Sequence, residues 1–388
     1  MPHTSTPIAT AASPSATASR YHTAGGRAFN FNAGPSILPE EVIRTFQEDM
    51  WNFRGSGLGI LEHSHRDKWF DELLFETIDL VRKVGSIPKN YHVLFMTGGS
   101  SSQNFIVPYN LLPKGRTADY IDTDFWSSRS IDDARQFGAG VHVAYTGKSE
   151  KYTRIPAASE ISYSENPAYV HFTSNNTIYG TQFRTEPTPP RNGAYLVCDA
   201  CSDIFSRPID FNKYGLVYAS VQKNLGITGA TLVVVRDDLV QNSNTDVPRM
   251  LQYRTMVKEE SRPNTPPHFA IYSASVMMRW ILAQGGLGAM EKRNQEKAAV
   301  IYAALDGNAG VYRAHAEKNS RSLMNITFRL ATEELEARFL NEAAASGLMG
   351  MKGHRATGGC RVSIYNAFPI EGCRALAEFM AEFARKNG

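Results

Sequence analysis

The fold of this chain is decided by two apolar stretches, each of which leads to a charged residue. They read AYLVCD at residues 194–199 and LVYASVQK at residues 216–223. Each has the length of a buried strand, with Asp199 or Lys223 at its carboxyl end or just beyond it. A carboxylate or an amine at the end of a buried strand is costly unless a partner or ligand compensates its charge. The two residues therefore predict a ligand site.

Further apolar stretches alternate with helical patterns along the chain. Such alternation implies an α/β fold, a mostly parallel sheet with helices on both faces. Ligands of these sheets bind at the carboxyl ends of the strands, which is where Asp199 and Lys223 fall. The expected strands are 91–96, 118–121, 141–145, 169–173, 194–198, 216–219 and 231–235. Three helices are expected: one begins near Ser102, one runs through Ile131, and one spans 269–283.

After residue 283 the pattern starts again and predicts a smaller α+β domain, with strands 323–328 and 361–365 and helices 332–345 and 372–385. We expect a disordered tail (1–28), a large cofactor-binding domain (44–281) and a small domain (29–43 with 282–388). The tail is rich in Ala, Ser and Thr and lacks acidic residues. We favour a plain flexible tail and a cytoplasmic location over an organelle transit peptide.

The composition excludes several classes of partner. The 388 residues are 42% hydrophobic, and 41 basic residues nearly balance 38 acidic ones without a block of like charge. We therefore expect small-molecule ligands and no nucleic-acid partner. Because no apolar run approaches the roughly 20 residues needed to cross a bilayer, we expect no membrane role.

The cysteines do not indicate a disulfide framework. The chain has four of them, which favours a reducing compartment. Cys198 and Cys201 form a C-x-x-C, which is typical of a redox pair or of half a zinc site. Because no second pair with metal-ligand spacing accompanies them, we expect two inert thiols and no metal site.

Pyridoxal phosphate would satisfy both Asp199 and Lys223. Its aldehyde forms a Schiff base with a lysine, and its pyridinium nitrogen pairs with a carboxylate. The segment MTGGSSSQN (96–104) follows a strand and opens a helix, as a phosphate cup does, although an ordinary Gly/Ser turn has the same pattern. Trp126 follows another strand end, where its indole either stacks on a flat cofactor ring or fills the core.

Three groups of cations indicate an anionic substrate. His65–Arg66 and His354–Arg355 are two His-Arg pairs far apart in the sequence, and Arg361 opens a strand beyond the second pair. Arginine binds carboxylate or phosphate in a fork, and a neighbouring histidine adds a donor. Either pair alone would be an ordinary solvated surface feature, so the interpretation rests on the constellation.

Seven segments of the chain resemble the phosphoserine aminotransferases of class V. The segments are FNFNAGP (29–35), SHR (64–66), SRPID (206–210), QKN (222–224), NTPP (264–267), KGHR (352–355) and SIYNA (363–367). The resemblance implies the type I aminotransferase fold and a homodimer with shared active sites. It implies amino transfer from glutamate to 3-phosphohydroxypyruvate, giving O-phospho-L-serine and 2-oxoglutarate in L-serine biosynthesis. It leaves open whether 4-phosphohydroxythreonine, in pyridoxine biosynthesis, is also a substrate.

The resemblance also implies residue roles around the cofactor. It assigns Lys223 to the Schiff base, Asp199 to the ring nitrogen, Trp126 to ring stacking and Thr177 to the phenolic oxygen. The cofactor phosphate would be held by Ser100, Ser101 and Gln222, with Asn264 and Thr265 reaching in from a second subunit.

For the substrate, Arg361 would bind the α-carboxylate. His65 and Arg66 would cradle the substrate phosphate together with His354 and Arg355, the latter pair contributed across the interface.

The sequence departs from the family at Ser101, where many bacterial relatives carry an arginine, and at residues 226–229 (GITG). Neither change removes a reacting group. The nearest rival is a related aminotransferase or desulfurase with an unphosphorylated substrate, and the two His-Arg pairs argue against it. A silent cofactor-binding protein would not need all the reacting residues, and an NAD oxidoreductase would need a glycine fingerprint that the chain lacks.

Overall fold

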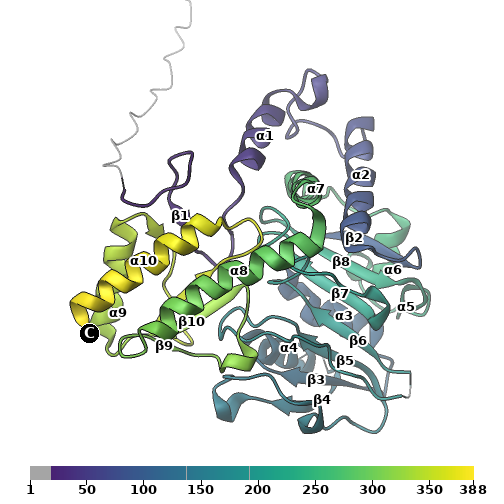
Figure 1. The fold of residues 1–388 in the computed structure, drawn as a ribbon. Helices are drawn as coiled ribbons and strands as arrows, with labels where there is room; N and C mark the ends of the chain where they lie inside the picture. The colour runs from purple at the N-terminus through teal and green to yellow at the C-terminus, as the bar shows by residue number, and fades with distance from the viewer. Residues whose placement is uncertain (1–18, 137, 192) are drawn as a thin grey trace, which may run out of the picture.

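A computed structural model of the chain describes residues 19–136, 138–191 and 193–388. Its centre is a seven-stranded sheet in the order β2-β8-β7-β6-β5-β3-β4 (Figure 1). The strands from β7 through β4 run parallel, and β8 is antiparallel to both β7 and β2. This sheet confirms the predicted α/β fold class. The strands are β2 (Tyr91–Thr97), β3 (Thr117–Asp122), β4 (Gly140–Thr146), β5 (Pro167–Thr173), β6 (Tyr195–Asp199), β7 (Tyr214–Ser220) and β8 (Ala230–Arg236).

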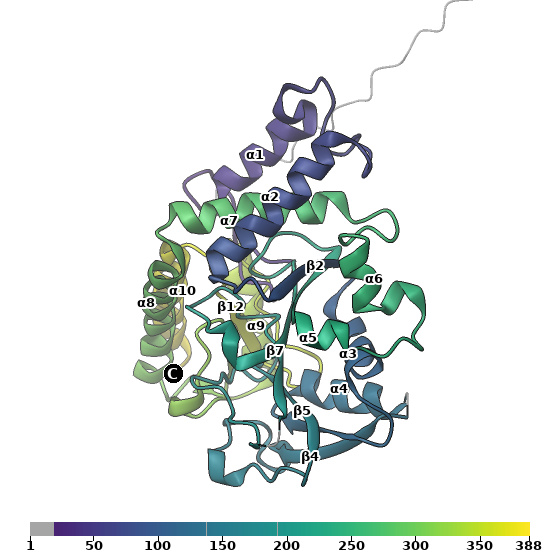
Figure 2. The ribbon, with the colours of Figure 1, turned by 90° about the vertical axis from the view of Figure 1, so that its right-hand side faces the viewer.

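Helices cover both faces of this sheet, which explains why its central strands are apolar along their whole length. Along β2, Val93 and Phe95 belong to one hydrophobic cluster, and Leu94 and Met96 belong to another on the opposite face. The first cluster includes residues of α1, α2 and α7, which form one layer at the top of Figure 2, and the second includes residues of α3, α4 and α6. The helices are α1 (Glu40–Trp51), α2 (Lys68–Gly85), α3 (Gln103–Leu111), α4 (Phe125–Gln136), α5 (Asp237–Gln241), α6 (Tyr253–Lys258) and α7 (His268–Ala283).

The C-terminal part of the chain builds a second core beside the large sheet (Figure 1). An antiparallel sheet in the order β12-β10-β9 packs there with three helices, as expected for the small α+β domain. Strand β1 (Phe29–Asn30) pairs with β11 (Leu348–Met349) and so joins this part, although the domain boundaries themselves stay a prediction. The other elements are α8 (Gly286–Gly307), β9 (Arg313–Ala314), β10 (Asn325–Arg329), α9 (Glu333–Ala345), β12 (Cys360–Ser363) and α10 (Ile370–Asn387).

The predicted tail is only partly within the described residues, because residues 1–18 lie outside them. Residues 19–28 make defined contacts with the C-terminal part. The Tyr21 N–H donates to the Ser346 carbonyl (2.9 Å), and the Tyr21 ring is buried in the second core. Arg20 forms ion pairs with Glu378 and Glu382 of α10. The folded part therefore begins about ten residues earlier than the composition indicates.

None of the helices within the described residues combines the length and the apolarity that a membrane crossing requires.

Candidate active site

The carboxyl ends of β5, β6 and β7 open into one cavity. The cavity brings together seven residues that the sequence predicts for the cofactor, from segments far apart in the chain. They are Ser100, Ser101, Trp126, Thr177, Asp199, Gln222 and Lys223.

Lys223 follows β7 in a turn that fixes its backbone and turns its amine into the cavity. The Ser36 hydroxyl donates to the Lys223 carbonyl (2.5 Å), and the Lys223 Nζ donates to the Thr177 Oγ1 (3.0 Å). Gly34 has a positive φ of 145°, and a Cβ added there would meet the Lys223 Cγ at 3.4 Å. The N-terminal segment thus packs closely against the base of this lysine.

Asp199 is the last residue of β6 and is held in one orientation. Its Oδ1 accepts the N–H of Cys201 (2.9 Å). Burial raises the pKa of Asp199, while the Cys201 hydrogen bond and the Lys223 charge oppose this shift. A buried carboxylate of this kind is stabilised when a cation lies against it, which is what a protonated ring nitrogen provides.

A buried polar pair lies next to Asp199 on the same sheet. Tyr218 of β7 is the register partner of Asp199, and its hydroxyl lies 3.0 Å from the His171 Nε2. Burial lowers the pKa of His171 to about 3, so its imidazole is neutral. This pair can therefore orient polar groups near Asp199 without adding a charge.

The MTGGSSSQN segment, which the sequence predicts to be a phosphate cup, lines this cavity with Gly99, Ser100, Ser101 and Asn104. Ser100 begins the 3₁₀ turn η2 (Ser100–Ser102), which leads into α3. The Ser100 N–H donates to the Ser220 Oγ (3.0 Å), and a Cβ added at Gly99 would meet nothing within 4 Å. Small side chains and open space at the start of a helix suit a phosphate group.

The predicted inert thiol Cys201 lines this cup. Its Sγ lies 2.8 Å from the Ser100 Oγ. Burial, and next the charge of Asp199, raises the pKa of the Cys201 thiol to about 12, so it stays protonated. All four cysteines are free and buried, and no cluster of His, Cys, Asp or Glu among the described residues could hold a metal ion.

The polar atoms of the cavity fit pyridoxal phosphate. Its lining combines one amine, one fixed carboxylate, one indole and a cup of small residues. The Thr173 Oγ1 lines the same cavity and is buried without a hydrogen-bond partner. A buried hydroxyl without a partner is costly, so this atom also indicates a polar ligand.

Three of the predicted substrate cations gather beside this cavity. Arg361 of β12 reaches the Thr177 carbonyl (Nη1 to O, 3.5 Å), and burial lowers its pKa. The His354 ring lies 5.3 Å from the Phe125 ring, next to Trp126. Burial, and next the positive charges of Arg361 and Arg355, lowers the pKa of His354. His354, Arg355 and Arg361 thus lie near Lys223 of their own chain.

The remaining predicted residues lie in a separate cavity. It is lined by His65, Arg66, Asn264 and Thr265, together with Lys258. Arg262 in this cavity is neutralised by Asp71 and Glu260, whereas no acidic partner within the described residues pairs with Arg66. The structure therefore divides the predicted site residues into two groups.

Asp124 is a further charged residue of the site that the sequence analysis did not single out. It lies two residues after the end of β3, and because β3 itself contains Asp119 and Asp122, the sequence gives no distinct signal at Asp124. The side chain is fully buried. Burial raises its pKa to about 7, while the backbone N–H groups of Phe125 and Ile178 and, next, the charge of Lys223 oppose the shift. Its charge also acts on Arg361.

The family model for class-V aminotransferases matches residues 28–376. A phosphoserine aminotransferase of Lysinibacillus sphaericus is 50% identical over 361 residues, which cover 93% of this chain and 99% of the relative. A second, from Herpetosiphon aurantiacus, is 48% identical over 93% of this chain and 99% of the relative.

Solved structures agree with these relatives. Phosphoserine aminotransferase from Bacillus circulans subsp. alkalophilus superimposes with a TM-score of 0.90 at 44% identity, over 93% of this chain and 99% of the other. The pyridoxal phosphate-bound enzyme from Trichomonas vaginalis gives 0.87 at 34% identity, over 92% and 100%. The chain belongs to the class-V aminotransferase family. Within that family its relatives are phosphoserine aminotransferases, and it is a pyridoxal phosphate-dependent transaminase of this group.

Proposed function

We propose that this chain transfers the amino group of glutamate to 3-phosphohydroxypyruvate and so forms O-phospho-L-serine and 2-oxoglutarate. The observation that carries the proposal is the group of cations beside the cofactor cavity. The phosphate cup already accounts for the cofactor's own phosphate. Arg361 is a largely buried guanidinium that reaches a carbonyl, and Arg355 and His354 lie next to it. A largely buried cation such as Arg361 requires an anionic ligand. The exposed Arg355 beside it offers a place for a second anion, and a phosphorylated keto acid supplies two anionic groups.

When bound, pyridoxal phosphate supplies an aldehyde that condenses with amines and a ring that accepts electron density from the substrate carbon. The chain's residues would hold it by complementary contacts. Ser100, Ser101 and Gln222 would bind its phosphate, Trp126 would stack on its ring, and Thr177 would contact its phenolic oxygen. Asp199 would keep a proton on the ring nitrogen.

Lys223 carries the proton transfer in this proposal. Its amine would take a proton from the substrate carbon and return it to a neighbouring atom, as a general acid–base group does. The Thr177 hydroxyl, 3.0 Å from the amine, would hold it in reach of that carbon. Arg361 would pair with the substrate α-carboxylate, which fixes the reacting carbon relative to Lys223.

We also propose that two copies of the chain share their active sites. His65, Arg66, Asn264 and Thr265 form a half-site that lacks the proposed Schiff-base lysine, Lys223, of the same chain. Large apolar side chains are exposed at the end of α1 and on the loop that follows it, with Trp51 86% and Leu61 58% exposed. Exposed apolar groups of this size favour an interface. In this arrangement Arg66 crosses to the second copy and Arg355 stays with its own Lys223, the reverse of the division that the sequence resemblance suggests.

Two measurements test the proposed function. The first compares kcat/KM for 3-phosphohydroxypyruvate and for hydroxypyruvate, and we expect a preference of at least about 10²-fold for the phosphorylated acid. A preference for the unphosphorylated acid would overturn the proposal. The second follows the cofactor absorbance. We expect this absorbance to change when glutamate is added alone and to return when the phosphorylated keto acid is added. Activity on 4-phosphohydroxythreonine and the cytoplasmic location stay predictions.

A further inference from the structure

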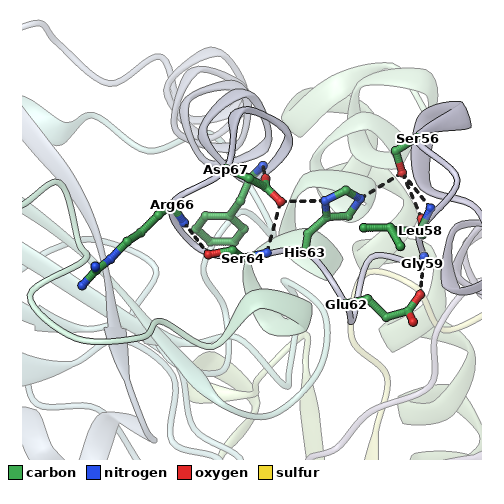
Figure 3. A network of polar contacts seen from close by, with 9 residues as sticks. Ser56, Leu58, Gly59, Glu62, His63, Ser64, Arg66 and Asp67 are labelled. Atoms are coloured by element: carbon green, nitrogen blue, oxygen red, sulfur yellow. Dashed lines mark hydrogen bonds and ion pairs between the residues drawn. The ribbon is translucent and has the colours of Figure 1, made fainter.

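The loop that precedes α2 contains a histidine with both ring nitrogens engaged (Figure 3). The side chain of His63 is 1% exposed, and its Nδ1 lies 2.8 Å from the Asp67 Oδ2. Its Nε2 lies 3.0 Å from the Ser56 Oγ. The ring packs edge-on against Phe53, with 5.7 Å between centroids. One buried side chain thus ties two separate parts of the loop together.

Asp67 anchors this arrangement to the helix. Its Oδ1 accepts the Phe70 N–H (2.9 Å), which caps α2, and its Oδ2 also accepts the Ser64 N–H (3.1 Å). Burial would raise the pKa of Asp67, but the hydrogen bonds from Phe70 and His63 outweigh it and lower the pKa. The carboxylate is therefore ionised at neutral pH, and it is held by three donors.

Ser56 anchors the other side. Its hydroxyl lies 3.0 Å from the Leu58 carbonyl and accepts the Leu58 N–H (3.2 Å). The order Ser56–His63–Asp67 is that of a hydrolase triad, but the serine here is bound into its own turn and the aspartate caps a helix. These extra bonds favour a structural clamp over a nucleophile.

The clamp lies next to the residues proposed to bind the substrate phosphate. His65 and Arg66 stand between His63 and the helix cap, and the Arg66 N–H donates to the Ser64 Oγ (3.2 Å). In Figure 3 the Arg66 side chain extends away from Ser56, on the far side of the clamp. Its guanidinium Nε lies 3.3 Å from the His65 Nε2. A long exposed side chain binds well only when its backbone is fixed, because ordering it costs entropy.

We propose that His63, held between Asp67 and Ser56, is a positioning residue that fixes the His65–Arg66 arm where it binds the substrate phosphate of a second copy. This inference rests on the proposed function. His63 touches neither substrate nor cofactor, so it acts through the arm. Its loss must therefore affect the phosphorylated substrate selectively.

The test replaces His63 with phenylalanine, which keeps a ring against Phe53 and removes both hydrogen bonds. The matched control is His92→Phe, because the His92 Nε2 also contacts a carboxylate, that of Asp237 at 2.7 Å, but lies on β2. The readout is the ratio of kcat/KM for 3-phosphohydroxypyruvate to that for hydroxypyruvate. We expect H63F to lower this ratio about tenfold. H92F should leave it unchanged, and the rate with hydroxypyruvate should be the same in both.

A second variant covers the case in which H63F does not fold. Asp67→Asn keeps a good N-cap for α2 but weakens the bond to His63, and we expect it to lower the ratio severalfold. Arg66→Ala separates the two hypotheses. If R66A leaves the ratio unchanged, the proposed role of the arm is wrong. If R66A lowers the ratio while H63F and D67N, both folded, keep the wild-type value, only the clamp is wrong.

Discussion

The two cavities of this molecule differ in how their charges are compensated. Around Lys223 and Asp199, each reacting group stands at the end of a buried strand and is fixed by its own chain. Around Arg66, the cationic side chain is exposed, stands on a loop and lacks an acidic partner among the described residues. In our proposal the first cavity carries out the chemistry and the second recognises the substrate phosphate. The second works only when another surface covers it, and that surface is the site of a second copy in our proposal.

The largest expected effect comes from Lys223→Ala, which removes the group that moves the proton. We expect kcat to fall by about 10³–10⁴-fold, the usual contribution of general acid–base catalysis at its upper end. Rapid-mixing measurement of the glutamate reaction checks this. Lys213→Ala is the control, because the Lys213 amine pairs with Glu186 away from the cavity. Normal turnover in K223A would remove the basis for assigning the chemistry to the first cavity.

A smaller effect is expected for the arginines. Arg66→Ala and Arg355→Ala should each lower kcat/KM for 3-phosphohydroxypyruvate by about 10²-fold, since each removes a charge-assisted bond to phosphate. The rate with hydroxypyruvate should change little. Steady-state kinetics with both acids gives the comparison. Equal losses for the two acids would mean that these residues support the fold and not the recognition of phosphate.

Asp124 tests the electrostatics of the first cavity through pH. Its pKa is raised from 3.8 to about 7, so the folded state holds the proton more tightly than the unfolded state. The resulting stability is present at low pH and is lost as pH rises through about 7. Between pH 5.5 and pH 8 the free energy of unfolding of the wild type should fall by about 2 kcal/mol relative to that of Asp124→Asn, at about 1.4 kcal/mol per pH unit below the raised pKa.

Urea unfolding of the wild type and of D124N at both pH values measures this difference. The control is Asp237→Asn at the start of α5, where the carboxylate contacts His92 and its pKa is lowered. A difference between D124N and the wild type that does not change with pH would mean that Asp124 is ionised throughout this range.

The sequence predicts the first cavity well because its residues are tied to strand ends. The expected strand 194–198 and the observed β6 agree closely, and so do 216–219 and β7. The reason is physical: strands buried on both faces are apolar throughout, so their ends are marked by the first charge. The strand alternation begins at Tyr91 and does not anticipate α1 or α2, which carry the loop with Arg66 between them.

Other features depend on contacts that no local pattern contains. The pairing of β1 with β11 joins residues more than three hundred positions apart, and Arg20 and Tyr21 contact α10 and the Ser346 carbonyl. The partition of the cations is another such feature. His65–Arg66 and His354–Arg355 have the same local pattern, yet the chain places only the second pair beside Lys223.

A mixing experiment tests this partition most directly. K223A chains are unfolded and refolded with an equal amount of R66A chains, and in parallel with R355A chains, in the presence of cofactor. If Arg66 acts across the interface, the first mixture contains dimers with one intact site, and about a quarter of wild-type activity should return. R355A should restore none, because Lys223 and Arg355 then never meet intact in one site. Recovery with R355A, or none with R66A, would contradict the account.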